Sequence, residues 1–288
     1  MKKIRILAHI HLFYQDMWPE LKKSISNIYL VNTEISLFVT MSSKNNLLEK
    51  EILNNFQNVR IIYSDNIGYD IAPFISCIND IDLAKFDFIV KMHSKRSLKL
   101  RDRFFENNGY SLILSQWRKE LLYPFSSKKI FKKHLNKLKE DGVGIVCANS
   151  LIVSDGRHSK KTYNTSLEYV NNSGSNKINK FSFVAGTMFI AKSNLFHKIK
   201  DLNIQIKDFN STNNRRDQFA HIMERAFGGF IYEQKQRIES VDKYCLMKIL
   251  HYKIINFFLG LLIKLTILKP YRIFKNLFRA ISKLMKIK

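Results

Sequence analysis

Short apolar runs that alternate with helix-patterned segments restrict the fold of this chain more than any other feature. Five such runs are rich in Ile, Val, Leu and Phe, as buried strands are: residues 4–10, 35–40, 59–63, 86–91 and 144–147. Segments with apolar residues at helical spacing separate the first four runs: residues 17–27, 47–56 and 71–78. Alternating strands and helices are typical of βαβ units, so the sequence predicts an α/β domain with a mainly parallel sheet.

The second half of the chain has a less regular pattern. Residues 107–139 carry helical patches, and residues 154–180 are rich in Ser, Asn, Lys and Gly. We expect a long surface loop over 154–180, of the kind that often serves as a lid. A strand is predicted over 181–191, a polar loop over 208–216 and a helix over 217–227.

The chain is strongly basic, with 48 Lys and Arg against 24 Asp and Glu and a formal net charge of +24. Such an excess favours a polyanionic partner: nucleic acid, an anionic membrane or phosphorylated substrates. The excess is concentrated near the C-terminal end, because no acidic residue follows Asp242 and ten Lys and Arg follow Lys243. We therefore predict a folded domain over residues 1–242 and a basic tail over residues 243–288.

The basic tail has the pattern of an interfacial membrane element. Residues 249–268 are strongly apolar but include one His and two Lys, which makes them a poor membrane-spanning helix. Apolar residues recur at helical spacing over 273–284, with basic residues between them. We expect residues 245–288 to form basic amphipathic helices that lie on an anionic membrane surface. The alternative is a helix that packs on the folded domain.

The three cysteines, Cys77, Cys147 and Cys245, are far apart and form no C-x-x-C pair. Scattered thiols argue for a reducing compartment and against a disulfide framework or a structural zinc site. The first residues, MKKIRILAHIH, lack the pattern of a signal peptide, because their apolar run is short and contains His9 and His11. We therefore expect a cytoplasmic protein, peripheral on the inner face of the plasma membrane.

A turn with anion-binding potential follows the third predicted strand. It reads SDNIGYDIAPF over residues 64–74, where Gly68 permits a tight turn and Pro73 falls in the first turn of the next helix. A strand–turn–helix start presents free backbone N–H groups to an anion. Asn66, Gly68 and Asp70 are therefore candidates for binding a phosphorylated donor, and Asp70 is suited to bond a ribose or sugar hydroxyl. Ordinary turn chemistry is the alternative.

Cations follow directly after the strand predicted over 86–91. Lys91, His93 and Lys95 share one face of that strand, because side chains alternate along a strand. Ligands of open α/β sheets bind at the carboxyl ends of the strands, and a group of cations there suits a diphosphate. These three side chains are predicted to hold the diphosphate of a nucleotide-activated donor; a solvated basic strand end is the alternative.

The third group of candidates spans the strand over 181–191 and the helix that follows the polar loop. Gly186 and Thr187, in the sequence FVAGTMF, are candidates with His221 for a sugar or acceptor pocket. Asp217 and Glu224 share a helix face with His221, and a carboxylate there can deprotonate an acceptor hydroxyl. Asp217, at the helix start, is the first choice as general base and Glu224 the second. A structural ion pair between Glu224 and the Arg after it is the alternative for that residue.

Six of these segments form a series in order along residues 8–228: AHIHLFY, NIGYDIAPF, KMHSKRS, WRKELL, FVAGTMF and AHIMERAFG. The series resembles the rhamnan synthesis protein F family of polysaccharide glycosyltransferases, and the basic tail lies outside it. One departure is Tyr69, where the family more often has Arg. The resemblance implies a nucleotide-sugar-dependent transferase of GT-A type, with a single Rossmann-like sheet and the donor at its strand ends.

The implied GT-A type also bears on metal use. Most such enzymes place Asp-x-Asp after the strand that corresponds to residues 86–90, to hold a divalent metal on the donor diphosphate. This chain has KMHSK at that place. We therefore expect protein cations to replace the metal and the enzyme to need no cofactor, with a divalent cation left open.

Together these observations predict that the domain over 1–242 is a glycosyltransferase. It would move a sugar, for which the resemblance indicates rhamnose, from a nucleotide-sugar donor to a lipid-linked surface polysaccharide such as O-antigen, capsule or cell-wall rhamnan. A non-catalytic membrane-associated scaffold of a polysaccharide assembly complex is the first alternative. A nucleic-acid-binding protein is the second, but no nucleic acid is expected as partner, because the sequence has no such motif and its basic excess lies beside apolar residues.

Overall fold

A computed structural model describes residues 3–97, 105–108, 110–113, 115–154, 159–210, 219–242 and 246–268. Its centre is a seven-stranded sheet with the strand order β11-β7-β10-β4-β1-β2-β3. These strands are β1 (Ile4–Leu12), β2 (Thr33–Met41), β3 (Val59–Tyr63), β4 (Phe88–His93), β7 (Val143–Val146), β10 (Phe189–Lys192) and β11 (Arg237–Glu239). Only β10 runs antiparallel to its neighbours in this sheet, which confirms the predicted α/β class with a mainly parallel sheet.

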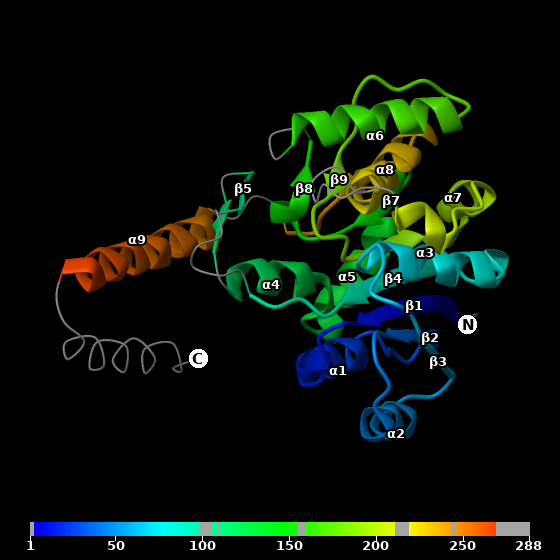
Figure 1. The fold of residues 1–288 in the computed structure, drawn as a ribbon, viewed down its shortest axis with the longest axis horizontal. Coiled ribbons are helices and arrows are strands. Elements are labelled where there is room, and N and C mark those ends of the chain that lie inside the picture. The colour runs from blue at the N-terminus through cyan, green and yellow to red at the C-terminus, as the bar shows by residue number, and fades with distance from the viewer. Residues whose placement is uncertain are drawn as a thin grey trace.

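The connections between the first four strands create the place where a ligand can bind. The chain passes from β1 to β2 through α1 (Trp18–Ser26) and from β2 to β3 through α2 (Asn46–Asn55), and α3 (Ile71–Asp80) returns it to β4. Right-handed crossovers require the returning helix to lie on the opposite face of the sheet, and Figure 1 shows α3 across β1 from α1 and α2. From β1, the chain adds β2 and β3 on one side and then β4 on the other side. The carboxyl ends of the strands at such a reversal of the strand order form a crevice.

The two strands beside this crevice are buried along nearly their whole length. All residues from Ile6 to Leu12 of β1 are buried, and so are all six residues of β4. Strands covered on both faces read as continuous apolar runs, which is why the sequence predicts them well. The polar exceptions, His9, His11, Lys91 and His93, all lie toward the carboxyl ends. Burial of these four polar side chains marks the crevice as a candidate functional site.

The remaining elements extend the sheet and cover it. They are β5 (Phe105–Asn107), β6 (Tyr110–Leu112), α4 (Ser115–Leu122), α5 (Lys128–Leu138), β8 (Ile152–Val153), α6 (Lys160–Ser173), β9 (Phe183–Val184), α7 (His197–Asp201), α8 (Phe219–Glu233) and α9 (Leu246–Leu268). Where α3 and α8 meet the sheet, Phe74 packs edge to face against three other aromatic rings, those of Phe189, Phe196 and Phe227. This cluster fixes both helices beside the crevice.

The loop predicted over residues 154–180 is wrong, because much of that segment is helix α6. Its first turn is capped by Ser159, whose hydroxyl accepts a backbone hydrogen bond. Tyr163, Ser166 and Val170 are buried at helical spacing, and α6 packs along α8. The polar composition of the segment concealed this narrow buried stripe, and tertiary packing rather than intrinsic propensity stabilises the helix.

The single strand predicted over residues 181–191 is also wrong, because a turn divides it into β9 and β10. Gly186 and Thr187 have φ angles of +77° and +48°, in the left-handed region that a strand cannot contain. β9 pairs with β8, and β10 pairs with β4 and β7. The turn between them projects to the carboxyl end of β4.

Three sequence predictions fall partly or wholly outside the described residues. Residues 206–210 form a 3-10 helix, and residues 211–218, which include Asp217, are not described. The helix predicted from 217 is described from Phe219 and ends at Glu233, six residues later than predicted. The amphipathic pattern over 273–284 likewise lies outside the described residues.

Helix α9 extends away from the rest of the domain, as Figure 1 shows. Its first turns are nevertheless packed, because Ile249 and Tyr252 are buried and the Asn256 amide donates to the Ser111 carbonyl at 2.8 Å. Among the residues that the structure describes, no helix combines the length and the hydropathy needed to cross a bilayer. The boundary predicted at residue 242 stays a prediction, with one face of α9 belonging to the domain core.

Candidate active site

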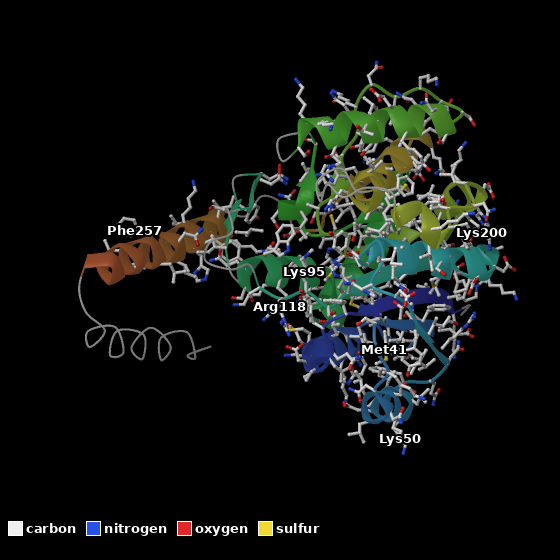
Figure 2. All side chains as sticks on the ribbon, viewed as in Figure 1. Met41, Lys50, Lys95, Arg118, Lys200 and Phe257 are labelled. Carbon is white, nitrogen blue, oxygen red and sulfur yellow. The ribbon has the colours of Figure 1, made fainter. Side chains whose placement is uncertain are left out.

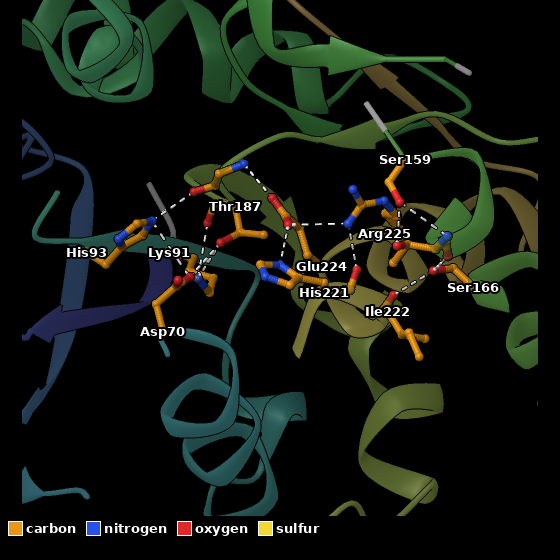
Figure 3. Close-up of polar contacts among 12 residues, drawn as sticks. Asp70, Lys91, His93, Ser159, Ser166, Thr187, His221, Ile222, Glu224 and Arg225 are labelled. Carbon is orange, nitrogen blue, oxygen red and sulfur yellow. Dashed lines mark hydrogen bonds and ion pairs between the residues drawn. The ribbon is translucent and has the colours of Figure 1, made fainter. Parts of the chain in front are cut away.

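Polar side chains from distant parts of the chain meet at the carboxyl end of β4 (Figure 3). Lys91 and His93 belong to β4, Asp70 immediately precedes α3, and Thr187 lies in the turn between β9 and β10. These four residues were candidates for separate reasons in the sequence. In the structure they form one contact network, which we call the strand-end cluster.

The ammonium group of Lys91 lies at the centre of the strand-end cluster. Lys91 is 0% exposed, and its Nζ donates to Asp70 Oδ2, to Thr187 Oγ1 at 2.8 Å and to the Thr187 carbonyl at 3.2 Å. The Thr187 hydroxyl in turn donates to Asp70 Oδ2 at 2.6 Å. An ammonium group has three hydrogens, and all three are used here. This geometry does not support a direct contact between Lys91 and a diphosphate.

Burial and charge act in opposite directions on the ion pair of Lys91 and Asp70. Burial raises the pKa of Asp70, but the adjacent His93 and Lys91 and two hydrogen bonds outweigh burial and hold that pKa well below its usual range. Burial lowers the pKa of Lys91, and the Asp70 carboxylate opposes this shift. The carboxylate therefore stays ionised, and the pair is close to neutral overall.

His93 connects β4 to the turn between β9 and β10. Its Nε2 lies 2.8 Å from the Gly186 carbonyl oxygen, which can only accept, so Nε2 carries the hydrogen. The same nitrogen lies 3.7 Å from Asp70 Oδ2. Burial lowers the pKa of His93, with Asp70 opposing. His93 thus positions the turn by donating from Nε2 to the Gly186 carbonyl.

Gly186 occupies a position where any side chain would be strained. Besides its left-handed φ, a Cβ at this position would lie 2.7 Å from Leu121 and 3.0 Å from Trp117. Both neighbours come from α4, in the segment that reads WRKELL. The turn is therefore pressed between α4 and the strand-end cluster, which holds Thr187 in its uncommon left-handed conformation.

Glu224 of α8 holds the same turn from the other side. Its Oε1 accepts a hydrogen bond from the Gly186 backbone N–H at 2.7 Å, and its Oε2 lies 3.6 Å from both His221 Nδ1 and Arg225 Nη1. Burial raises the pKa of Glu224, but these donors outweigh burial and lower it. Both carboxylate oxygens are engaged. The structural ion pair left open by the sequence is therefore present, and Glu224 also lies next to His221.

His221 and Tyr69 form the exposed rim of the cluster. Their ring centroids are 5.6 Å apart, and more than a third of each side chain is exposed. Tyr69 has a φ of +56°, which turns its ring out of the loop before α3.

A pair of buried histidines lies beside the cluster and was given no role from the sequence. His9 Nε2 and His11 Nδ1 both contact the Thr40 hydroxyl, at 3.1 and 2.9 Å. Burial lowers the pKa of His9 well below its usual value and that of His11 to about 4. Both rings are therefore neutral near pH 7. Their alternation with apolar residues in AHIHLFY was the available signal, because it puts both rings on one face of β1.

A cavity of about 210 Å³ opens at the carboxyl ends of β2 and β3, beside the start of α3. Thr40 lines it and so connects it to the two histidines. Its other lining residues are Phe38, Ser42, Ile62, Tyr63, Ser64, Asp65, Pro73, Ser76 and Ile206. A larger cavity, of about 680 Å³, lies away from the strand-end cluster, where α9 meets α1 and α4.

The remaining candidates lie at the margin of the cluster or outside the described residues. Asn66 is exposed, and Gly68, with a φ of +67°, forms the tight turn before α3. Lys95 is partly exposed just after β4 (Figure 2). Asp217 lies in the segment that is not described, two residues before α8 begins. The structure thus brings together seven of the eleven candidates: Asp70, Lys91, His93, Gly186, Thr187, His221 and Glu224.

Metal ligands are not grouped at this site. Within the described parts of the chain, no group of three or more His, Cys, Asp and Glu side chains could hold a metal ion. Asp70, the carboxylate nearest the end of β4, already receives the Lys91 ammonium. A divalent cation does not fit beside that ammonium group, because the two charges would repel each other at close range.

Several solved structures share the general arrangement of this chain. TarS from S. aureus (residues 1–349) is 12% identical, with 84% of this chain and 59% of that chain covered and a TM-score of 0.42. The galactosyltransferase LgtC, in complex with donor and acceptor sugar analogs, is 9% identical, with coverage of 83% and 73% and a TM-score of 0.41. A 4-diphosphocytidyl-2C-methyl-D-erythritol synthase from Anaerococcus prevotii is 10% identical, with coverage of 88% and 99% and a TM-score of 0.40. The chain spans about three fifths of the TarS fragment, and similarities at this level assign no function.

The family relationship is clear from the sequence itself. No curated protein matches the chain. The sequence model of rhamnan synthesis protein F, however, matches residues 1–236, about four fifths of the chain. This match includes all six segments of the series and ends before α9. The chain therefore belongs to the rhamnan synthesis protein F family.

Proposed function

We propose that the protein is a nucleotide-sugar-dependent glycosyltransferase of polysaccharide synthesis. One observation carries the proposal: segments of the family series that are far apart in the chain converge on the strand-end cluster. Asp70 comes from NIGYDIAPF, Lys91 and His93 from KMHSKRS, and Thr187 from FVAGTMF. Glu224, from AHIMERAFG, closes the network. A site assembled at the ligand-binding end of an α/β sheet supports a catalytic role over that of a passive scaffold.

The donor is proposed to lie across the carboxyl ends of β1 to β4. The 210 Å³ cavity is smaller than the roughly 300–1,000 Å³ of typical small-molecule pockets, so it suits one ring system such as a nucleobase. The diphosphate would lie over Asn66 and Gly68 in the turn before α3, at the positive end of the helix dipole, with the partly exposed Lys95 as the accessible cation. Asp70, whose side chain is 17% exposed, can still accept a bond from a donor hydroxyl.

Lys91 and His93 have a revised role in this proposal. Their hydrogens are used by Asp70, Thr187 and the Gly186 carbonyl, so they position the residues around the donor rather than grip its phosphates. The cluster is then preorganised before the donor arrives, which lowers the cost of binding. Gly186, Thr187 and His221 would border the donor sugar and the acceptor.

Asp217 remains the proposed general base. It would take the proton of the acceptor hydroxyl as that oxygen bonds to the anomeric carbon and the bond to the nucleoside diphosphate breaks, so that the diphosphate leaves with the electron pair. Glu224, the second choice, has both oxygens engaged by neighbours. This favours a supporting role for Glu224, on the turn and on His221.

We propose metal-independent transfer because β4 ends in a lysine and a histidine and not in paired carboxylates. An ammonium group bonded to the Asp70 carboxylate lies at the strand end where most GT-A enzymes would place metal-binding carboxylates. Full turnover in excess chelator is the expected outcome. Strict dependence on manganese or magnesium would contradict it.

The finer substrate assignments remain part of the proposal. Rhamnose is the proposed donor sugar, and a lipid-linked glycan of O-antigen, capsule or cell-wall rhamnan is the proposed acceptor. The enzyme would work on the inner face of the plasma membrane, with residues 245–288 against anionic lipid. The absence of any acidic residue after Asp242 supports this last point.

Thermal unfolding in the presence of dTDP, UDP and GDP tests the proposed donor site. A nucleotide that binds only the folded chain adds about 2.7 kcal/mol of stability at a hundred times its Kd, so one nucleotide should raise the melting temperature clearly. Asp70→Asn should abolish that rise. Asp80→Asn, at the far end of α3 and exposed, is the matched control and should retain it. Absence of any shift, together with no transfer from any nucleotide sugar, would reject the function.

A further inference from the structure

One side of α9 exposes an unusual concentration of large apolar side chains. Six are between 46% and 75% exposed within fifteen residues: Met247, Leu250, Ile254, Phe257, Phe258 and Leu261. Successive helix residues turn by about 100°, so these six fall on one continuous stripe. Isolated exposed apolar residues are ordinary, but a contiguous patch marks a binding surface. We call this stripe the outward face; Figure 2 shows Phe257 on the part of α9 that extends from the domain.

The opposite side of α9 is docked on the domain by a buried carboxylate. Glu120 of α4 is 1% exposed, and it accepts hydrogen bonds from Lys248 Nζ and, at 2.8 Å, from the Tyr252 hydroxyl. The Ser150 hydroxyl donates to the same carboxylate at 2.7 Å. Lys248 also lies over the Tyr123 ring, 4.4 Å from its centroid. We call these contacts the α9 dock.

The α9 dock determines which side of the helix is free. A helix with an apolar stripe normally turns that stripe toward its own domain. Here the polar side, with Lys248 and Tyr252, faces inward, and the apolar side faces solvent. Rotating the helix to bury the stripe would leave the Glu120 carboxylate buried without its cation, which is strongly unfavourable. The outward face is therefore left open to a partner outside this domain.

Charge identifies the occupant. His251 and Lys253 are exposed on α9 beside the outward face, no acidic residue occurs after Asp242, and ten Lys and Arg follow Lys243. An apolar stripe flanked by basic residues, with no acidic residue after Asp242, matches the interface of a bilayer that contains anionic lipid. A second copy of the chain is disfavoured, because it would bring two strongly basic tails together.

We propose that the outward face of α9 lies in the interfacial layer of an anionic bilayer while the α9 dock holds its other side on the domain. Membrane contact then sets the orientation of the whole domain, because α9 cannot rotate independently. The proposed function enters only in supplying a membrane-bound acceptor; the membrane contact is derived from α9 itself. The helix would lie along the surface and not cross it.

Vesicle flotation with the full chain tests the outward face. The probes are vesicles of phosphatidylcholine alone and of phosphatidylcholine with phosphatidylglycerol. The unmodified chain should float with the anionic vesicles, and the double variant Phe257→Ser with Phe258→Ser should bind about a hundredfold more weakly. Val31→Ser with Leu47→Ser removes two exposed apolar side chains outside α9 and is the matched control. Equal flotation of the double variant and the control would overturn the proposal.

Self-association is the competing explanation, and sedimentation of the same variants separates the two. If the unmodified chain dimerises in solution and the double variant is monomeric, with flotation unchanged, the occupant is a second copy and the membrane proposal is overturned. A monomer in both cases, with flotation lost only in the double variant, supports it.

Hydrogen exchange tests the α9 dock. Glu120→Gln removes the charge, and Tyr252→Phe removes a single hydroxyl with little risk to folding. In both variants the amides of α9 should exchange about tenfold faster than in the unmodified chain, while vesicle binding persists. Unchanged exchange in both would show that the dock does not hold the helix, and the fixed orientation would be abandoned.

The membrane proposal and the proposed function can each be rejected without the other. Flotation requires no donor, and the nucleotide-dependent thermal shift requires no vesicle. A chain that floats but binds no nucleotide would retain the membrane face and lose the proposed function. A chain that binds a nucleotide but does not float would do the reverse.

Discussion

Among the described residues, two lysines, Lys91 and Lys248, bond to largely buried carboxylates, and the two sites serve different purposes. In the strand-end cluster, Lys91 is 0% exposed and bonds to Asp70 and Thr187 in the middle of the sheet. In the α9 dock, Lys248 is 22% exposed and bonds to Glu120 at the edge of the domain. The first pair joins segments that all lie within the family match; the second joins that region to a helix outside it. The same chemistry positions a site in one place and attaches an element in the other.

The pairs also differ in how well each carboxylate is supported without its lysine. Asp70 would keep the Thr187 hydroxyl and a contact with His93. Glu120 would keep two hydroxyl donors, from Ser150 and Tyr252. Loss of the lysine should therefore be more damaging in the strand-end cluster than in the α9 dock.

Lys91→Met should have the largest effect. Removing one partner of a buried pair costs about 3–5 kcal/mol, so the free energy of unfolding in urea should fall by that amount, and the nucleotide-dependent thermal shift should be lost. Lys95→Met, at the margin of the same site, is the control and should change stability by less than about 0.5 kcal/mol. Equal losses of unfolding free energy in the two variants would mean that Lys91 is not the centre of the cluster.

Acid should weaken the region around the strand-end cluster through His11. Its pKa is about 4 in the folded chain and about 6.5 when unfolded, so between these values only the unfolded chain binds the proton. Stability contributed by the neutral ring is thus fully present above about pH 6.5 and falls as the pH drops toward 4, by up to about 3 kcal/mol. When the free energy of unfolding in urea is plotted against pH over this range, the slope should be shallower for His11→Asn than for the unmodified chain. An equal slope in the two would contradict this role for His11.

Gly186→Ala should have an intermediate effect. The new Cβ would meet Leu121 and Trp117 in addition to the strain of a left-handed φ, at a cost of about 2–3 kcal/mol. Gly142→Ala is the matched control, because it has a similar φ but would meet only the flexible end of the Arg237 side chain. Its cost should be about 1 kcal/mol. A similar loss of unfolding free energy at both positions would indicate that the α4 side chains move to make room for the new Cβ.

Lys248→Met should have the smallest effect of the four. Glu120 keeps its two hydroxyl donors, so the loss should be about 1–2 kcal/mol and confined to α9. Amide exchange in α9 should accelerate while the nucleotide-dependent thermal shift is retained. Loss of nucleotide binding in this variant would show that the two regions are coupled, and the contrast between them would disappear.

The sequence predicts the sheet well because its strands are covered on both faces. The predicted bounds of β3 coincide with the observed ones, and those of β1, β2 and β7 differ by one or two residues. Helix α6 escaped prediction because its buried side, with Tyr163, Ser166 and Val170, is narrow and lies within a polar segment. The turn at Gly186 was not predicted, because its two left-handed residues lie between two apolar runs that each have the pattern of a strand.

The candidate site was predicted as a set of residues but not as a set of contacts. Lys91 was expected to face a diphosphate, yet its partner Asp70 lies 21 residues earlier and Thr187 lies 96 residues later. All three hydrogens of the Lys91 ammonium group are donated to these distant residues, so no local pattern in the sequence predicts the bonds. The α9 dock is a clearer case, since Lys248 and Glu120 are 128 residues apart and neither stood out in its own segment.

The turn that carries Gly186 and Thr187 also has a consequence for how the chain folds. Thr187 contacts Asp70 across 117 residues, and Gly186 is held by Glu224 from 38 residues further on. Contacts between residues so far apart form slowly, because a long loop must close first. A chain emerging from the ribosome would therefore build much of the sheet before its donor site. Only a chain synthesised through α8 can complete that site, so truncated chains should not sequester the donor.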